Sequence, residues 1–230
     1  MINGMMAFAE RFWNGGNAGE VENENLLPSP QSEAGAQLAR FEEKMTLHRD
    51  RFHKEKMRWV ANAQIEWQVQ IDDSEPLAAY GGVVDLDAFC QQHLINIGDT
   101  ATAQARTVIV AERDMDIEAW IGFCVPARSN RNGYGIGEQG RWEGGGQCFV
   151  NGMEVLPPAL WQEPGKYSYH FNTWGKPEEE APFTDEQFYW MRRPAKIHLQ
   201  KGENEVVIKT PKTYQGLRWS FAFIPIYLPL

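Results

Sequence analysis

The sequence predicts a mainly β protein, an antiparallel β-sandwich preceded by two α-helices, on three observations. In residues 65–71 apolar side chains alternate with polar ones, which is the period of a half-buried strand. Asn151-Gly152 stands between two short apolar runs, and both residues tolerate the positive φ of a type I′ hairpin turn. Near the end of the chain, Trp219, Phe221 and Phe223 fall on one face of a final strand.

Residues 1–60 are predicted to be a helical lead, and residues 61–230 the sandwich. Residues 2–13 carry apolar side chains at steps of three and four, one face of an amphipathic helix that Gly15-Gly16 ends. After an acidic linker, Ser29 is predicted to cap a second helix that has Pro30 in its first position and runs to about Lys56. Its narrow apolar seam consists of Leu38, Phe41, Met45, His48 and Phe52.

Six strands are predicted in the sandwich besides the Asn-Gly hairpin. They cover residues 65–71, 106–112, 117–123, 196–199, 205–209 and 217–225. A short helix is predicted between Asp85 and Asn96. Residues 126–146 are rich in Gly, Asn, Arg and Ser, and residues 157–194 are aromatic without a clear period, so both are predicted to be long loops. Loops above ~15 residues in a compact domain tend to be functional or disordered.

The composition argues against two classes of partner. The 230 residues carry a formal net charge of −9 with no run of Lys and Arg, a poor match for the phosphate backbone of nucleic acid. No apolar run approaches the ~20 residues of a membrane span, and the N-terminus has no basic region followed by an apolar core. Neither nucleic acid nor a membrane is therefore expected as a partner.

The sulfur-bearing and titratable residues show no spacing typical of a metal or redox site. Cys90, Cys124 and Cys148 are predicted to be buried thiols, and the alternative is a Cys124–Cys148 disulfide if their strands are neighbours. The five histidines show no ligand spacing, so no metal-ligating residue is assigned. The loop carboxylates are expected to be solvated. The alternative is a structural calcium ion, and no other cofactor is expected.

Two sets of stretches resemble a known family. Residues 5–16 resemble the last barrel helix of glycoside hydrolase family 20, the β-N-acetylhexosaminidases, where a helix ending in Ala-x-Glu-Arg-x-Trp follows the eighth strand. Residues 119–123, 150–158, 201–204 and 219–223 resemble the galactose-binding-like, jelly-roll β-sandwich that follows the barrel in some bacterial members. The resemblance implies a C-terminal accessory domain that buttresses the barrel or holds glycan. It also implies a periplasmic or secreted parent, although the chain itself does not fix a compartment.

The catalytic residues of that family have no counterpart here. The family uses an Asp-Glu pair on an earlier barrel strand, where the Asp orients the acetamido group of the substrate and the Glu is the general acid. Asp185-Glu186 is the only adjacent Asp-Glu pair, and no parallel βα repeat surrounds it. It is therefore predicted to be a loop pair that caps the chain or bridges to Arg192 or Arg193, and no catalytic residue is assigned.

The long loops carry the residue types of a glycan site. Sugar rings stack on aromatic faces, and their hydroxyls take hydrogen bonds from guanidinium groups. The candidate carbohydrate-binding residues are Arg128, Arg131, Tyr134, Trp142, Trp161 and Trp190. The alternative is that the tryptophans plug the ends of the sandwich or pack on a barrel. The functional alternative is a free-standing carbohydrate-binding or protein-interaction module. If no barrel covers residues 2–13, they are expected either to dock onto the helix around residues 38–52 or to self-associate.

Overall fold

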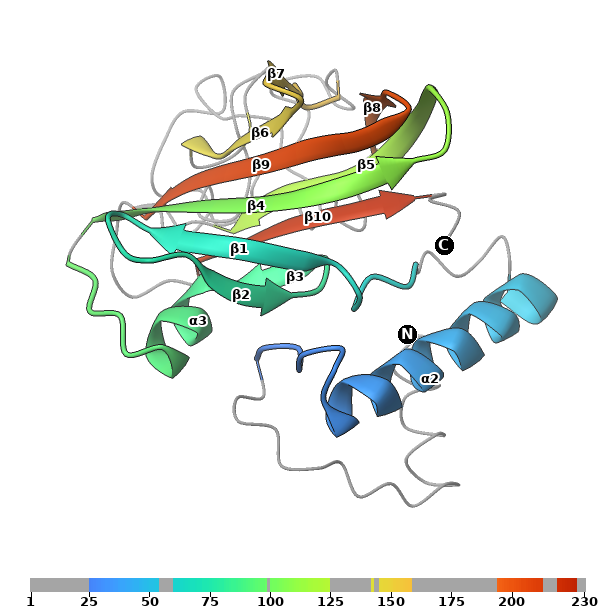
Figure 1. Ribbon diagram of the computed structural model, residues 1–230, viewed down its shortest axis with the longest axis horizontal. Helices are drawn as coiled ribbons and strands as arrows, with labels where there is room; N and C mark the ends of the chain where they lie inside the picture. Colours follow the sequence, from blue (N-terminus) through green and yellow to red (C-terminus); the bar gives the residue numbers. More distant parts are fainter. Residues whose placement is uncertain are drawn as a thin grey trace, which may run out of the picture.

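The computed structural model describes residues 25–53, 60–98, 100–124, 142, 145–158, 194–212 and 219–226 (Figure 1). These residues form two antiparallel β-sheets with two α-helices beside them. The mainly β class predicted from the sequence is confirmed. The predicted helix over residues 2–13 and most of both long loops lie outside the described residues.

The larger sheet has six strands in the order β2-β1-β4-β9-β6-β7. Its strands are β2 (Leu77–Tyr80), β1 (Glu66–Ile71), β4 (Ala101–Ala111), β9 (Gly202–Lys212), β6 (Gln147–Val150) and β7 (Met153–Glu154). At its centre β4 and β9 pair along their whole lengths, from Ala101 opposite Lys212 to Ala111 opposite Gly202. Buried and exposed side chains alternate along both strands, as they do in a sheet with one covered face.

The smaller sheet shares one hydrophobic core with the larger one. Its four strands run in the order β3 (Val83–Asp85), β10 (Ser220–Ile226), β5 (Met115–Cys124) and β8 (Ala195–Leu199). At the centre of the core the Trp67 ring of β1 meets Phe221 and Phe223 of β10 edge-on, with centroid distances of 5.1 and 5.8 Å. The architecture is therefore sandwich-like, and the aromatic residues of the final strand lie inside it, as their alternation predicts.

The chain passes from the larger sheet to the smaller one at Gly81 and Gly82, between β2 and β3. Gly81 has a φ of +96°, and its N–H donates to the Ile65 carbonyl at 2.7 Å. A Cβ on Gly82 would lie 2.6 Å from Cγ1 of Ile224, so only glycine fits this crossing without a shift of its neighbours. The sequence prediction missed β2 and β3, because four-residue and three-residue strands beside a Gly-Gly pair resemble a turn.

The other strands and the hairpin are found where the sequence predicts them, with shifted ends. Asn151 and Gly152 join β6 to β7 with φ values of 50° and 78°, the positive values that the turn was predicted to need. The largest shift is in β4, which begins at Ala101, five residues before the predicted start at residue 106.

Helix α2 (Glu33–His48) begins later than predicted. Its N-cap is Ser32, whose hydroxyl accepts a hydrogen bond from the Gly35 N–H at 3.0 Å, so the prediction of Ser29 as the cap is wrong. Ser29 lies one turn earlier, where its carbonyl accepts from the Ser32 N–H at 2.9 Å. A short π-helix, η1 (Arg49–His53), continues the chain, and the predicted end near Lys56 lies outside the described residues.

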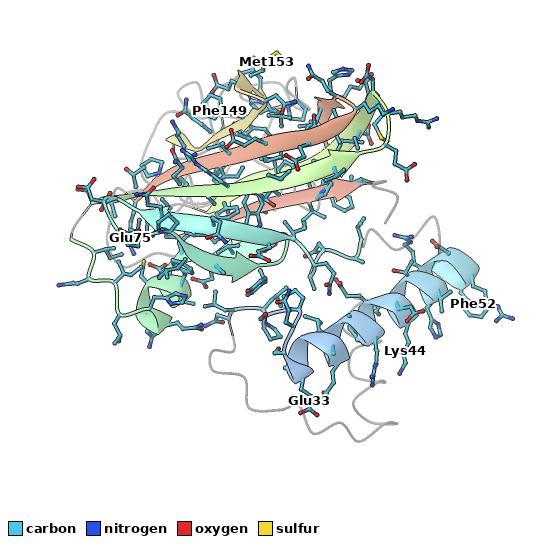
Figure 2. The ribbon with its side chains drawn as sticks, in the orientation of Figure 1. Glu33, Lys44, Phe52, Glu75, Phe149 and Met153 are labelled. Atoms are coloured by element: carbon cyan, nitrogen blue, oxygen red, sulfur yellow. The ribbon has the colours of Figure 1, made fainter. Side chains whose placement is uncertain are left out.

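The buried face of α2 also differs from the predicted seam. Met45 is buried, but Phe52 is 60% exposed at the far end of the helical segment (Figure 2). The buried line instead includes Gly35 and Glu42. The carboxylate of Glu42 accepts from the backbone N–H groups of Asn62 at 2.8 Å and Ala63 at 3.1 Å. This polar anchor turns the helix so that a glutamate, and not a large apolar residue, faces the segment leading into β1.

The predicted short helix after Asp85 is confirmed as α3 (Leu86–Gln92). Asp85 is its N-cap, and its carboxylate accepts from the Ala88 N–H at 2.9 Å. Within the described ranges, neither α2 nor α3 has the length and apolar character needed to cross a membrane.

Candidate functional site

Of the six candidate carbohydrate-binding residues, the structure describes only Trp142. Arg128, Arg131, Tyr134, Trp161 and Trp190 lie outside the described residues. Glycan binding by these six residues therefore stays a prediction.

Trp142 is 5% exposed and lies in the core. Its indole N–H donates to the Val155 carbonyl at 2.7 Å, and its ring centroid lies 6.0 Å from that of Phe123. Gly146 also lies against Phe123, and a Cβ on Gly146 would come within 2.4 Å of the ring. This environment matches the packing alternative for Trp142, and stacking on a sugar would first require the ring to become exposed.

Two of the three cysteines are free, buried thiols, as predicted. Burial raises the pKa of the Cys90 thiol to about 11, and it raises the pKa of Cys148 further. The alternative of a Cys124–Cys148 disulfide is wrong. Cys148 lies on β6 of the larger sheet and Cys124 ends β5 of the smaller sheet, so their strands are not neighbours.

The described loop carboxylates accept hydrogen bonds from backbone groups and side chains at strand ends. Asp72 accepts from the Thr102 N–H at 2.8 Å, and Asp114 accepts from the Lys201 N–H at 2.7 Å. Asp116 lies 2.8 Å from Nδ1 of His198. Across the described ranges, no group of three or more His, Cys, Asp or Glu side chains is placed to hold a metal ion. A calcium ion stays a prediction.

A buried asparagine joins two of the stretches that resemble the family 20 accessory domain. Asn204 is fully buried at the start of β9, and its amide nitrogen donates to the carbonyls of Gln200 at 2.8 Å and Gly202 at 3.0 Å. Its amide oxygen accepts from the Gln200 N–H and from the side chain of Asn151, both at 2.8 Å. The turn at residues 201–204 and the Asn-Gly hairpin therefore form one hydrogen-bonded unit.

A second buried polar cluster joins β9, α3 and β10. Lys212 is 6% exposed and forms an ion pair with Asp87 of α3. The same carboxylate accepts from the Trp219 N–H at 2.7 Å, and the Lys212 ammonium lies 5.5 Å from the centroid of the Trp219 ring. These contacts join β9, α3 and β10 at one end of the two sheets. No sequence pattern predicted them, because Asp87, Lys212 and Trp219 are far apart in the chain.

The larger sheet carries an unusual set of side chains on its outer face, the side turned away from the core. In the register of the strands, one row of directly opposed residues crosses all six strands, and a second row crosses four. The first row consists of Ala78, Gln68, Arg106, Val207, Phe149 and Glu154. The second consists of Gln70, Gln104, Lys209 and Gln147. We call these ten residues the amide face, because four of them are glutamines.

Contacts within the amide face orient several of its side chains. With its amide oxygen turned toward Arg106, Gln104 accepts from Nε at 3.0 Å and from a terminal guanidinium nitrogen at 2.8 Å. The Lys209 ammonium lies 5.5 Å from the centroid of the Phe149 ring. Gln147 donates to the Glu154 carboxylate at 3.3 Å. Gln104 lies before the predicted start of its strand, and Phe149 stands in a short apolar run, so the sequence did not predict that these residues share a face. The strand register brings them together.

Comparison with known proteins gives structural neighbours and no family. No protein-family model matches the chain. No curated protein sequence matches it. A β-glucosidase from Kluyveromyces marxianus superposes on 70% of this chain at 10% identity, with a TM-score of 0.39. A family 31 α-xylosidase from Xanthomonas citri superposes on 74% at 9% identity, with a TM-score of 0.31.

The chain spans only 14% of the length of each of these two proteins. Both are named as glycosidases, and neither is named as a hexosaminidase. At these TM-scores the similarity carries no argument about function, so the function of this chain is argued from its own residues.

Proposed function

We propose that this chain is a non-catalytic, C-terminal accessory domain of a β-N-acetylhexosaminidase-like glycoside hydrolase, with jelly-roll, galactose-binding-like topology. One observation carries the proposal: the separate stretches that resemble the family 20 accessory domain are partners in the fold. Residues 119–123 on β5 pair with residues 221–225 on β10, with Phe123 opposite Phe221 and Ile121 opposite Phe223. Residues 150–158 and 201–204 are joined through Asn151 and Asn204.

A buttressing role is supported by the attachment of α2. The carboxylate of Glu42 is 7% exposed and accepts from two backbone N–H groups just before β1. Two hydrogen bonds from successive backbone N–H groups to one buried side chain hold the helix in a fixed orientation. A helix fixed in this way would transmit the position of a preceding barrel to the sheets.

The proposal is tested with a chimera and with the chain alone. In the chimera, residues 1–230 replace the C-terminal region of a family 20 hexosaminidase, and thermal inactivation is compared with that of the truncated barrel. We expect the chimera to survive heating longer than the truncated barrel. The chain alone is expected to leave a chromogenic N-acetyl-β-D-glucosaminide intact.

Two results would contradict the proposal. Turnover by the chain alone that is lost in Asp185→Asn or Glu186→Gln would make it an enzyme. A chimera no more stable than the truncated barrel would favour the second candidate, a free-standing carbohydrate-binding module, which the amide face supports.

A further inference from the structure

We propose that the amide face binds an uncharged, extended oligosaccharide, laid across the strands of the larger sheet. The choice of ligand rests on the accessory function proposed above, but the site is argued from the face itself. Figure 1 shows this broad face free of the two described helices, α2 and α3, which lie toward the β2 side of the sheet. Figure 2 marks Phe149 toward its β6 edge.

The hydrogen-bonding groups of the face match sugar hydroxyls. Each glutamine amide has two donors and one acceptor oxygen and carries no charge, and a hydroxyl is likewise both a donor and an acceptor. With its amide oxygen turned toward Arg106, Gln104 accepts two bonds from the guanidinium, at 2.8 and 3.0 Å, and these bonds orient both side chains. A ligand that binds them therefore orders fewer side chains, which lowers the entropic cost of association.

The β6 side of the face supplies an apolar platform. Phe149 is half-buried and lies opposite Val207, so the aromatic ring and the aliphatic side chain are adjacent on the outer surface. The Lys209 ammonium lies over the Phe149 ring, 5.5 Å from its centroid, and this flexible side chain has to move aside for a sugar. The C–H face of a pyranose can then pack on the ring while its equatorial hydroxyls reach the neighbouring amides. Stacking at one end and hydrogen bonds along the rows fit one sugar chain better than separate small ligands.

The charges on the face favour a neutral ligand. Arg106 and Lys209 lie within the rows, as does Glu154 at the β7 end. Two further carboxylates flank the rows: Glu66, which accepts from the Gln68 amide at 3.4 Å, and Glu205, whose oxygen lies 3.8 Å from the Arg106 guanidinium. These opposite charges largely compensate one another. Neither a polyanion nor a strongly acidic or basic peptide would find a complementary potential there.

The geometry of the sheet favours an oligosaccharide over a monosaccharide. Neighbouring strands lie about 4.8 Å apart, so the row from Gln70 to Gln147 extends over roughly 14 Å. A chain of three or more sugar units crossing the strands would place successive units over successive strands. A single sugar would reach only part of a row and bind more weakly.

The test is a titration of the full chain by calorimetry with two neutral probes, N-acetylchitopentaose and cellopentaose, and with heparin as the anionic comparison. We expect a neutral pentasaccharide to bind in the millimolar to high micromolar range, roughly −4 to −6 kcal/mol. N-acetylglucosamine alone should bind at least fivefold more weakly, and heparin should give no saturable signal.

Variants locate the site. Gln104→Ala should weaken pentasaccharide binding about fivefold, or about 1 kcal/mol, by removing one hydrogen-bonding side chain. Phe149→Ala should weaken it further, and Phe149→Tyr, which keeps the ring, should restore most of it. Gln92→Ala removes an exposed amide from α3 and is the matched control, expected to have no effect. Thermal unfolding of each variant separates lost binding from lost folding.

Each outcome separates this inference from the accessory function. If Gln104→Ala and Phe149→Ala leave pentasaccharide binding unchanged, the amide face is not the binding site, and the proposed accessory function is unaffected. If the chain binds no sugar at tens of millimolar but the chimera is stabilised, the sugar site is overturned and the buttressing role stands. Weaker attachment of the barrel in the two variants, without any sugar binding, would make the face a protein interface and overturn the inference. If the two variants weaken sugar binding but the chimera is not stabilised, the amide face is a sugar site and the proposed accessory function is contradicted.

Discussion

Three single residues are held by specific local contacts. The Glu42 side chain accepts from the N–H groups of Asn62 and Ala63, backbone groups about twenty residues away. Asn151 adopts a positive φ in the hairpin turn, which few residue types other than glycine accept. Trp142 is buried in the core, and its indole N–H donates to the Val155 carbonyl.

Glu42 provides a prediction about pH. Burial raises the pKa of its carboxyl above the ordinary value of 4.5, with the two backbone hydrogen bonds opposing the shift. The native state then holds this proton more tightly than the unfolded chain. The stability that Glu42 contributes is therefore complete below pH 4.5 and is lost as the pH rises through the higher folded pKa.

Urea unfolding of Glu42→Gln between pH 4 and about 8 measures this effect, because the amide keeps an acceptor oxygen without the titration. We expect the stability of the wild type to fall relative to the variant as the pH rises. Glu43→Gln, on the exposed side of α2, is the control. A wild type that gains stability over the variant with rising pH would show that the two N–H donors outweigh burial.

Whole elements were predictable where one face is strongly apolar. β1 places Trp67, Val69 and Ile71 on one side, so its period was plain. The first half of β4 was missed because its core residues are Ala101, Ala103 and Ala105, small side chains with low strand preference. These alanines belong to the same core cluster as the larger side chains of β9 and the core aromatic residues, and those larger side chains fill the space around them.

Two prolines inside strands follow a shared rule. Pro225 lies on β10 opposite Ala119 of β5, and β3 pairs with β10 only at residues 220–222. Pro211 lies on β9, and β6 pairs with β9 only at residues 206–209. A proline lacks the N–H that a second neighbour would use, so each is tolerated where one neighbouring strand has ended.

The packing of β6 against β5 gives a prediction for Gly146→Ala. The added methyl would lie 2.4 Å from the Phe123 ring, which Trp142 already contacts, so the ring has little room to move away. We expect a loss of about 1–3 kcal/mol in the free energy of unfolding, typical of an overpacked core. At Gly98 the nearest atom to an added Cβ is 4.0 Å away, and Gly98→Ala is expected to be close to neutral in urea unfolding. Equal effects of both changes would contradict the proposed contact.

At the scale of the whole molecule, the sequence predicted the mainly β class but not which residues share a surface. The amide face depends on the register of β1, β4, β9 and β6, whose residues are up to about 140 positions apart. No local pattern carries that information. The smaller sheet shows a second long-range feature: Trp120, Ile224 and Ile226 form an apolar cluster with Val60, apart from the shared core.

The apolar face predicted for residues 2–13 bears on the state of the whole chain. If no barrel covers that face, it is expected either to dock onto the helix around residues 38–52 or to self-associate, because an uncovered apolar face of that size is unstable in water. Self-association would give a larger mass in light scattering for the full chain than for a form that begins at Leu27. Docking would give equal masses and a less stable shortened form. Identical masses at every concentration would contradict self-association through this segment.

The long ladder between β4 and β9 also determines when the protein can fold. Its partners are about a hundred residues apart, from Ala101 with Lys212 to Ala111 with Gly202. Contacts so distant in the chain slow folding, because the loop entropy is lost before the pairing energy is gained. A ribosome adding roughly 5–20 residues per second needs several seconds to make that interval. During that time β4 is complete and β9 does not yet exist, so the alanine-lined inner side of β4 stays open to chaperones until β9 has emerged.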